Sequence, residues 1–280
     1  MMAAGKKAVE GEGGFRMEIR PLEKNKDEGK ISFILKGANA PLANLLRRTV
    51  LEEVAVMAIE EVEFRKNSSI LYDEIIAHRL GLLPLSTDLK SYNLKEKCNC
   101  KGKGCSRCQL KMTLKAKGPS VVYASDIRTR DAAIKPVYPK MPVVKLLKGQ
   151  ELELEATAIL GKGKEHVKWS PGLIYYKYKP SIEIVKKCEN PEKVVKSCPL
   201  KIYEIKNEEI IINKDNLLKC HLCGACIETS NGAIKVTEVK DEFIFYIESW
   251  GQLTPKEIMA EAFGIIDQKL DDFNDKLKAG

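Results

Sequence analysis

Apolar residues near the start of the chain follow first the period of a strand and then the period of a helix. Residues 31–35 alternate between apolar and polar side chains, which predicts a half-buried strand. After Pro41, a residue typical of a first helical turn, apolar residues recur every three or four positions. These residues are Leu42, Leu45, Leu46 and Val50. The first part of the chain is therefore expected to supply one strand and one amphipathic helix.

The C-terminal end repeats this order of strand and helix. Apolar residues recur at every second position over 243–247, and Thr254, Pro255 and Glu257 form the signature of a helix N-terminus. The helix predicted to follow carries an apolar stripe over about 22 residues, or about 33 Å. The stripe consists of Ile258, Ala262, Phe263, Ile266, Leu270, Phe273 and Leu277. One short helix is too small to cover it, so we expect the rest of the chain or a partner subunit to do so.

The positions of these patterns suggest how the chain is divided. Because both ends supply a strand and a helix, residues 15–55 and 235–280 are predicted to form one discontinuous domain. Alternation at 112–116 and 151–160 predicts strands, and we expect 56–184 to be a mostly β insert. Residues 185–234 form a separate cysteine-containing segment, and residues 1–14 are expected to be a flexible tail. The predicted fold class is α+β.

Composition limits the class of protein. Hydrophobic residues make up 44% and charged residues 31% of the 280 residues, which is typical of a globular protein. The apolar runs fall far short of the roughly 18 residues that a bilayer-spanning helix needs. The first residues lack the apolar core of a signal peptide. We therefore expect a cytoplasmic protein that makes no membrane contact.

The net charge of +8 is distributed unevenly. Between Lys95 and Lys117 lie eight basic residues and a single acid, Glu96. The same stretch holds four cysteines, and four thiolates around a divalent cation carry a net negative charge that this excess partly offsets. The stretch is interpreted as a solvated basic loop around a metal site. Docking to an acidic protein or to a phosphate backbone is the alternative.

Eight of the nine cysteines fall into two sets of four, and the first set predicts zinc. It has the spacing C-x-C-x4-C-x2-C, with two glycines that allow a short loop to turn back on itself. Four thiolates complete a tetrahedral zinc site and leave no position for substrate, so the site would be structural. Incidental thiols or disulfides are the alternative. The predicted ligands are Cys98, Cys100, Cys105 and Cys108.

The second set predicts one iron–sulfur cluster. A bacterial ferredoxin run reads C-x2-C-x2-C-x3-C-P, and its last cysteine ligates the cluster of the other run. Here one run lacks its last cysteine, which is Ser230, and the other keeps only Cys188 and the terminal Cys198-Pro199. One cluster therefore keeps four ligands and the second is absent. Three or four irons are both compatible with the pattern, and a second zinc is the alternative. The predicted ligands are Cys198, Cys220, Cys223 and Cys226.

The stretch between the two runs also fits a ferredoxin fold. Strand-like residues at 202–205 and 210–212 are separated by polar residues, which predicts a hairpin. Residues 185–234 are therefore expected to be a ferredoxin-like iron–sulfur domain.

No catalytic constellation is recognisable in the sequence. His78 and His166 stand apart from any serine or carboxylate pattern typical of a nucleophile and its base. The chain has no glycine-rich phosphate-binding motif, and Gly161 and Gly163 are expected to form a turn after the strand at 151–160. A chain without catalytic residues of its own is therefore expected.

Four segments and the two cysteine sets together resemble one family of RNA polymerase subunits. The family comprises the amino-terminal domain of bacterial alpha, its archaeal counterpart and the third-largest subunit of eukaryotic polymerase II. The resemblance, closest to the archaeal member, extends over nearly all of residues 15–277. The segments are APLANLLRRT at 40–49, DEIIAHRLGLLPL at 73–85, GKGKEHVKWSP at 161–171 and FYIESWG at 245–251.

The resemblance implies a non-catalytic assembly subunit of DNA-dependent RNA polymerase, with the discontinuous domain as its dimerisation domain. Such a subunit pairs with the small alpha-like subunit L, and the pair recruits the other subunits, including the large catalytic ones. Sequence-specific DNA binding is not expected. Two alternatives are considered. The first is an electron carrier, because a ferredoxin module ordinarily carries electrons. The second is a zinc-dependent nucleic-acid module that uses the basic stretch. The residues that the resemblance places at the interface are Leu42, Leu45, Leu46, Ile258, Phe263, Ile266 and Leu270.

Overall fold

The computed structural model describes residues 17–25 and 29–279, so the predicted tail at 1–14 lies outside the described residues. The fold is a mixture of helices and mostly antiparallel sheets. Two compact units divide the chain. Unit 1 contains Ser32–Ala43, Tyr176–Phe245 and the residues up to Glu23, and unit 2 contains the remainder. The domain boundaries expected from the sequence stay predictions.

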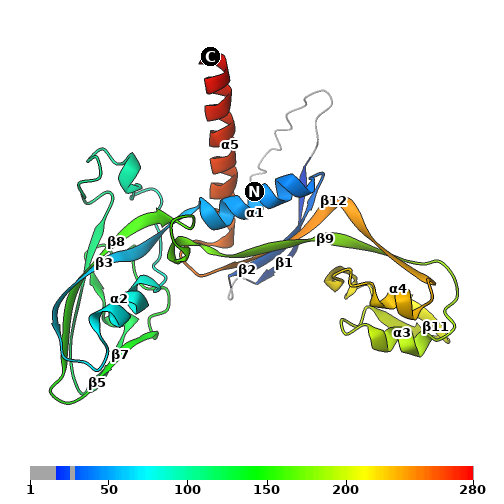
Figure 1. Cartoon of the computed structure of the whole chain (residues 1–280), viewed down its shortest axis with the longest axis horizontal. Coiled ribbons are helices and arrows are strands. Elements are labelled where there is room, and N and C mark those ends of the chain that lie inside the picture. Colours follow the sequence, from blue (N-terminus) through cyan, green and yellow to red (C-terminus); the bar gives the residue numbers. More distant parts are fainter. Residues whose placement is uncertain (1–16, 26–28, 280) are drawn as a thin grey trace, which may run out of the picture. The chain divides into compact units, whose positions relative to one another are not determined.

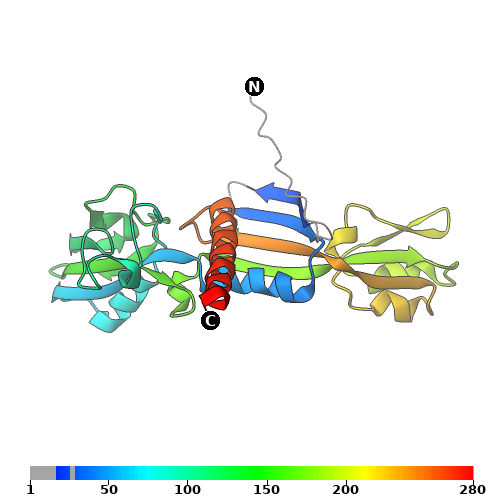
Figure 2. The same ribbon diagram turned by 90° about the horizontal axis from the view of Figure 1, so that it is seen from above.

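A four-stranded sheet in the order β1-β2-β12-β9 joins strands from both ends of the chain. Figure 2 shows β2 (blue), β12 (orange) and β9 (green) side by side. Within unit 1 its core is aromatic: the rings of Phe33 and Phe245 stack with centroids 5.3 Å apart. Residues 32–35 are all buried, so the prediction of a strand buried on one face only is wrong at its centre. The strands are β1 (Glu18–Asn25), β2 (Lys30–Lys36), β9 (Gly172–Ile184) and β12 (Ile234–Ser249).

The second sheet, in the order β3-β8-β4-β6, forms the core of unit 2. Its central strand β8 alternates between buried and half-buried residues over 151–158, as the sequence pattern predicts. Helix α2 (Asp73–Gly81) lies against this sheet in Figure 1, with Ile76 and Leu80 buried. The strands are β3 (Ala55–Asn67), β4 (Leu110–Lys117), β6 (Arg128–Thr129) and β8 (Glu151–Lys162), and β5 (Ser120–Tyr123) pairs separately with β7 (Pro142–Leu146).

The charge of part of the basic stretch at 95–117 is offset by glutamates on the exposed face of this sheet. Strand β4 carries Lys111, Lys115 and Lys117, which form ion pairs with Glu155, Glu153 and Glu151 of β8 at 2.5, 2.8 and 3.2 Å. The antiparallel register sets Lys115 opposite Glu153 and Lys117 opposite Glu151. The free positive charge of the stretch is therefore smaller than its composition suggests.

A small module within unit 1 contains the second set of cysteines. The hairpin expected there is confirmed: β10 (Tyr203–Lys206) pairs with β11 (Glu209–Ile212), each about one residue from its predicted bounds. Two short helices, α3 (Pro191–Ser197) and α4 (Ala225–Thr229), accompany the hairpin. The four elements share a small apolar core of seven buried residues. They are Val194, Ile202, Tyr203, Ile210, Cys220, Cys226 and Ile234.

Helices α1 (Ala40–Glu52) and α5 (Pro255–Ala279) begin where the sequence predicts. At α5 the predicted capping box is present: Thr254 N–H donates to Glu257 Oε2 at 2.8 Å, and Glu257 N–H donates to Thr254 Oγ1 at 3.3 Å. At α1 the cap is Asn39, whose Oδ1 accepts from Leu42 N–H. Local hydrogen bonds therefore fix both starts.

Helix α5 is only partly covered by the other residues that the structure describes. Ile258, Met259 and Ala262 in its first half are buried, whereas Leu270, Phe273 and Leu277 in its second half are 56%, 59% and 64% exposed. Figure 1 shows this second half (red) extending away from the rest of unit 2. Two explanations were considered for the stripe, and within residues 17–25 and 29–279 coverage by the rest of the chain accounts only for its first half.

Two glycines near the end of β8 permit close packing, and the turn expected after this strand is formed at 163–165, about two residues later than predicted. Gly161 instead lies within the strand, where a Cβ would overlap the ring of the buried Trp169. A Cβ at Gly163 would overlap the carbonyl oxygen of Leu51. The motif around 161–171 therefore serves the packing of this strand end against its neighbours.

Gly161→Ala is expected to lower the free energy of unfolding by about 1–3 kcal/mol, because the added methyl group displaces the Trp169 ring. Gly264→Ala is the matched control, since a Cβ there meets nothing within 4 Å on helix α5. The control should stabilise the protein by about 0.5–1 kcal/mol through helix propensity. Urea unfolding of both variants measures the difference, and equal midpoints would contradict the packing role of Gly161.

The middle of α5 is anchored by one carboxylate. Glu53 accepts from Lys162 of β8 and from Lys269 of α5, each at 2.9 Å. Burial raises the pKa of the Glu53 carboxyl, but the hydrogen bonds from Lys269 and Lys162 outweigh it, so the pKa lies below its ordinary value. Within unit 2, this pair of bonds holds the helix to the sheet.

Glu53→Gln is expected to lower the free energy of unfolding at pH 7 by about 1 kcal/mol, a typical value for charged hydrogen bonds that are partly exposed. Because the folded pKa is depressed, the wild-type advantage is present above the unfolded pKa of about 4.3 and is lost as pH falls through the folded pKa. Unfolding titrations between pH 7 and 3 measure it. A constant difference across that range would contradict the ion-pair explanation.

Candidate metal centres

The first set of cysteines is brought together by one short loop. The loop runs from the 3-10 turn at Lys95–Lys97 to the start of β4, and its backbone turns through Lys101, Gly102 and Gly104 with φ of 54°, 78° and 88°. A Cβ at Gly104 would displace the end of the Gln109 side chain, and the φ of 88° is strained for any residue other than glycine. The sulfurs of Cys98, Cys100, Cys105 and Cys108 all lie within 4.8 Å of one another.

The spacing of these sulfurs fits a single tetrahedral ion. Cys98 Sγ lies 3.5 Å from Cys105 Sγ, and Cys108 Sγ lies 3.6 Å from Cys100 Sγ and 3.8 Å from Cys105 Sγ. Zinc–sulfur bonds of about 2.3 Å in a tetrahedron require sulfur–sulfur distances of about 3.8 Å. The backbone N–H of Cys105 also donates to Cys108 Sγ at 3.2 Å. The four cysteines therefore form a group that can bind a metal ion.

The protonation of these thiols differs within the set. Burial raises the pKa of the Cys108 thiol to about 12. Burial also opposes ionisation of Cys100, but hydrogen bonds from Cys98 and Cys108 outweigh it and lower the pKa of Cys100 to about 6. A divalent cation that binds all four sulfurs therefore has to displace protons, above all from Cys108.

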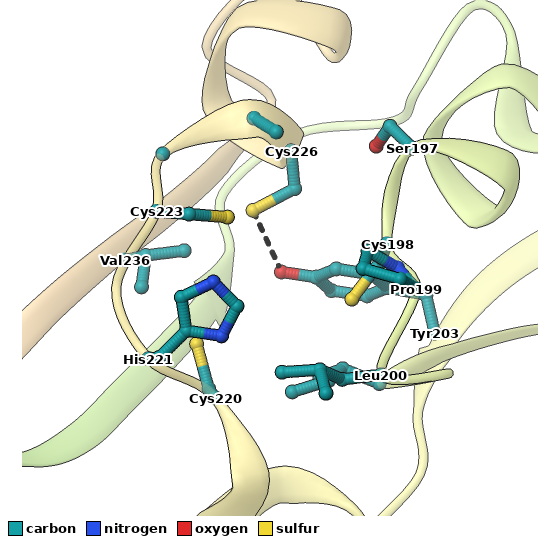
Figure 3. A pocket seen from close by; sticks show the side chains of 13 residues that line it. Ser197, Cys198, Pro199, Leu200, Tyr203, Cys220, His221, Cys223, Cys226 and Val236 are labelled. Carbon is teal, nitrogen blue, oxygen red and sulfur yellow. Dashed lines mark hydrogen bonds between the residues drawn. The ribbon is translucent and has the colours of Figure 1, made fainter.

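The second set of cysteines lines a hollow of about 360 Å³ in the small module, a volume that includes open space. Figure 3 shows the sulfurs of Cys198, Cys220, Cys223 and Cys226 arranged around this hollow. Cys220 and Cys226 are buried, Cys198 is half-buried and Cys223 is exposed. The hollow is thus closed on one side and reaches the surface beside Cys223 and His221, which is also exposed.

The backbone conformation of residues 220–226 places Cys220, Cys223 and Cys226 beside the hollow. Leu222 and Gly224 adopt the left-handed conformation, with φ of 62° and 81°, so the chain turns between successive cysteines. Helix α4 begins immediately afterwards and contains Cys226. The chain segment with Cys198 follows α3, and Figure 3 shows Cys198 across the hollow from the other three cysteines.

The spacing of the second set differs from that of a single-ion site. Among the described residues, the set at 98–108 is the one group of three or more potential ligands whose atoms lie within 4.8 Å of one another. The four cysteines around the hollow do not form such a group, and a cluster of several metal ions does not require its ligands to lie that close together. Apolar side chains, among them Leu200, Ile202 and Val236, line the remaining surface.

Two residues near this hollow were not predicted from the sequence. The Tyr203 hydroxyl donates to Cys226 Sγ at 3.1 Å, and Lys177 Nζ donates to the carbonyl oxygen of Cys220 at 3.0 Å. Burial, followed by the bond to Cys226, raises the pKa of Tyr203. Both contacts link positions more than twenty residues apart in sequence, and no local pattern signals them.

Ser230, which replaces the last cysteine of one run, and Cys188, which remains from the absent cluster, have other environments. The Ser230 hydroxyl donates to the Ile227 carbonyl and accepts from Ile234 N–H, both at 3.1 Å, so it stabilises the turn after α4. Cys188 lines a different hollow, together with residues 184–187 and 208–210. Burial raises the pKa of its thiol. Neither residue joins the four cysteines of the second set.

The residues expected at a subunit interface differ in exposure. Leu46 and Ile258 are buried within the chain, and Leu45 and Leu270 are 46% and 56% exposed. Leu42, Phe263 and Ile266 are half-buried.

Of the helices in the described part of the chain, none combines the length and apolarity that crossing a membrane requires.

Comparisons with known proteins identify the family. Residues 61–175 match the family described as RNA polymerase Rpb3/RpoA insert domain. DNA-directed RNA polymerase subunit Rpo3 of Methanosphaera stadtmanae is 37% identical over 263 residues, which cover 91% of this chain and 96% of that protein. The same subunit of Archaeoglobus fulgidus is 38% identical, and the match covers 92% of this chain and 96% of that protein. The subunit of Pyrococcus horikoshii is 37% identical, and the match covers 94% of this chain and 98% of that protein. The chain therefore belongs to the family of DNA-directed RNA polymerase subunit Rpo3.

Proposed function

We propose that the chain is a cytoplasmic, non-catalytic assembly subunit of DNA-dependent RNA polymerase that pairs with the small alpha-like subunit L. In this proposal the pair nucleates recruitment of the other subunits, including the large catalytic ones. Relatives that are similar over more than 90% of the chain are named as a polymerase subunit, which supports a role within that enzyme. The interface with L follows from the observation below.

The observation that carries the proposal is the uncovered stripe on α5. Leu270, Phe273 and Leu277 lie three and four positions apart, so they share one helix face, and all three are more than half exposed. The half-buried Phe263 and Ile266 continue the stripe toward the covered end of the helix. Apolar residues exposed along one helix face are typical of a protein interface. We propose that L covers this stripe.

We propose that the two cysteine sets hold metals that stabilise small parts of the protein. Zinc at Cys98, Cys100, Cys105 and Cys108 would close the basic loop, and the sulfur spacing supports it. One iron–sulfur cluster, [4Fe-4S] or [3Fe-4S], at Cys198, Cys220, Cys223 and Cys226 would brace the module around the hollow. Each group supplies binding free energy to a region with little apolar core of its own.

Direct sequence-specific DNA binding forms no part of the proposal. The pairing of Lys111, Lys115 and Lys117 with glutamates of β8 supports this, because the neighbouring carboxylates offset the positive charge of these exposed side chains. A nucleic-acid module would instead present its basic residues to the phosphates.

Co-expression with subunit L under anaerobic conditions tests the proposal. Size-exclusion chromatography, with analysis of iron, zinc and sulfide in the eluted peak, should give a one-to-one heterodimer with one zinc and three or four irons. A chain that keeps its metals but elutes apart from L would contradict the assembly role and favour an electron carrier. A heterodimer without iron and sulfide would contradict the cluster alone.

A further inference from the structure

Tyr203 places a phenol hydroxyl inside the hollow that the second set of cysteines lines. Its side chain is 2% exposed, and its hydroxyl donates to Cys226 Sγ at 3.1 Å, the bond drawn in Figure 3. Buried tyrosines ordinarily satisfy the hydroxyl with an oxygen acceptor. Here the acceptor recorded within the described residues is a sulfur.

Both ends of this hydrogen bond are held by the fold. Tyr203 is the first residue of β10, where it pairs with Ile212, and its ring belongs to the apolar core of the module. Cys226 lies in the first turn of α4, directly after the left-handed Gly224. Since both residues are buried and both backbones lie in regular elements, the fold holds the hydroxyl close to the sulfur.

We propose that Tyr203 is a positioning residue that acts through Cys226 to favour the reduced state of the iron–sulfur cluster. The inference rests on the cluster site proposed above. One-electron reduction adds negative charge that spreads onto the cysteine sulfurs, and a donor at the sulfur stabilises that charge. Hydrogen bonds to sulfur are among the features that set the reduction potentials of such clusters. The effect is strengthened by the apolar surroundings of this hydroxyl.

Tyr203→Phe removes the hydroxyl and keeps the ring, so it isolates the hydrogen bond. At a fixed potential near the midpoint, the ratio of reduced to oxidised cluster is expected to fall about tenfold, which corresponds to about 59 mV for one electron. The measurement is a redox titration of the full chain, purified anaerobically, with dithionite as the electron donor. The step transfers one electron and no proton.

Tyr178→Phe is the matched control, because Tyr178 packs against Phe243 in the sheet and does not line the hollow. Its midpoint potential should equal that of the wild type. A Tyr203→Phe protein with full iron and sulfide but an unchanged potential would overturn the role of Tyr203 and leave the cluster in place. Wild-type protein without iron and sulfide would overturn the cluster itself, so the two failures are distinguishable.

A second variant decides the question if Tyr203→Phe loses iron. Incorporation of 3-fluorotyrosine at position 203 keeps the ring and the hydroxyl, and fluorine makes the hydroxyl a stronger donor. The proposal expects the midpoint potential to rise, opposite to the change in Tyr203→Phe. An unchanged or lower potential with full iron content would overturn it.

Discussion

The double change Leu270→Asp and Phe273→Asp is expected to weaken binding to subunit L by about a thousandfold. Both side chains are more than half exposed in the free chain, so they contribute little to its own fold. Burying each against a partner gains about 1.5–3 kcal/mol, and a buried carboxylate without a partner opposes binding further. A total of about 4 kcal/mol corresponds to three powers of ten in affinity. Isothermal titration calorimetry of the purified subunits measures it.

The matched control is Ile70→Asp, which makes the same kind of change at a side chain that is 80% exposed before helix α2. We expect this variant to bind L as the wild type does. The double variant should also keep the wild-type unfolding midpoint, which separates lost binding from lost folding. Wild-type affinity in the double variant would contradict the assignment of the α5 stripe to L.

Features set by neighbouring residues were predictable from the sequence. The start of α5 follows from Thr254 and Glu257, which lie within one turn and satisfy each other's backbone groups. The hairpin of β10 and β11 and the alternation of β8 follow from the period of apolar residues. The cysteines at 98–108 also come together as expected, because eleven residues with two glycines can form the whole site.

Features that depend on distant residues were not predictable. Glu53 is held by Lys162 and Lys269, and no pattern links positions more than one hundred residues apart. The expected turn begins at Gly163 because β8 continues through Gly161, and the sequence does not reveal that Trp169 packs on the α-carbon of Gly161. The centre of β2 is covered on both faces, whereas alternation indicates only that one face is apolar. In each case the environment is created by the tertiary fold.

The interface residues show the same limit. A helical stripe in the sequence gives the face of a helix but not how far the chain's own core extends along it. Ile258 and Leu270 belong to one predicted stripe, yet the first is buried in the chain and the second is exposed. The structure therefore selects the second half of α5 for tests of partner binding, because substitutions in the first half would also disturb the core.

Cys108→Ser is expected to abolish zinc binding and to open the loop at 98–108. Zinc contributes on the order of 10 kcal/mol to the folding of small metal-dependent elements, and four thiolates are required to complete the tetrahedron. The loop exposes Lys101, Lys103 and Arg107, which are trypsin sites, so its opening is directly measurable. We expect trypsin to cleave this loop about a hundredfold faster. A loss of roughly 2.7 kcal/mol from the free energy of opening the loop is enough for that change. The strands of unit 2 should stay folded, since their core does not include the four cysteines.

Cys188→Ser is the matched control, because this cysteine lies apart from both sets of four and lines a different hollow. It should retain one zinc per chain and wild-type resistance to trypsin. Adding a chelator to the wild type should reproduce the cleavage pattern of Cys108→Ser, since both treatments remove the ion that holds the turns at Lys101, Gly102 and Gly104. A Cys108→Ser chain that retained zinc after dialysis and resisted cleavage would show that the loop is held by its backbone hydrogen bonds alone. That result would contradict the assignment of zinc to these four cysteines.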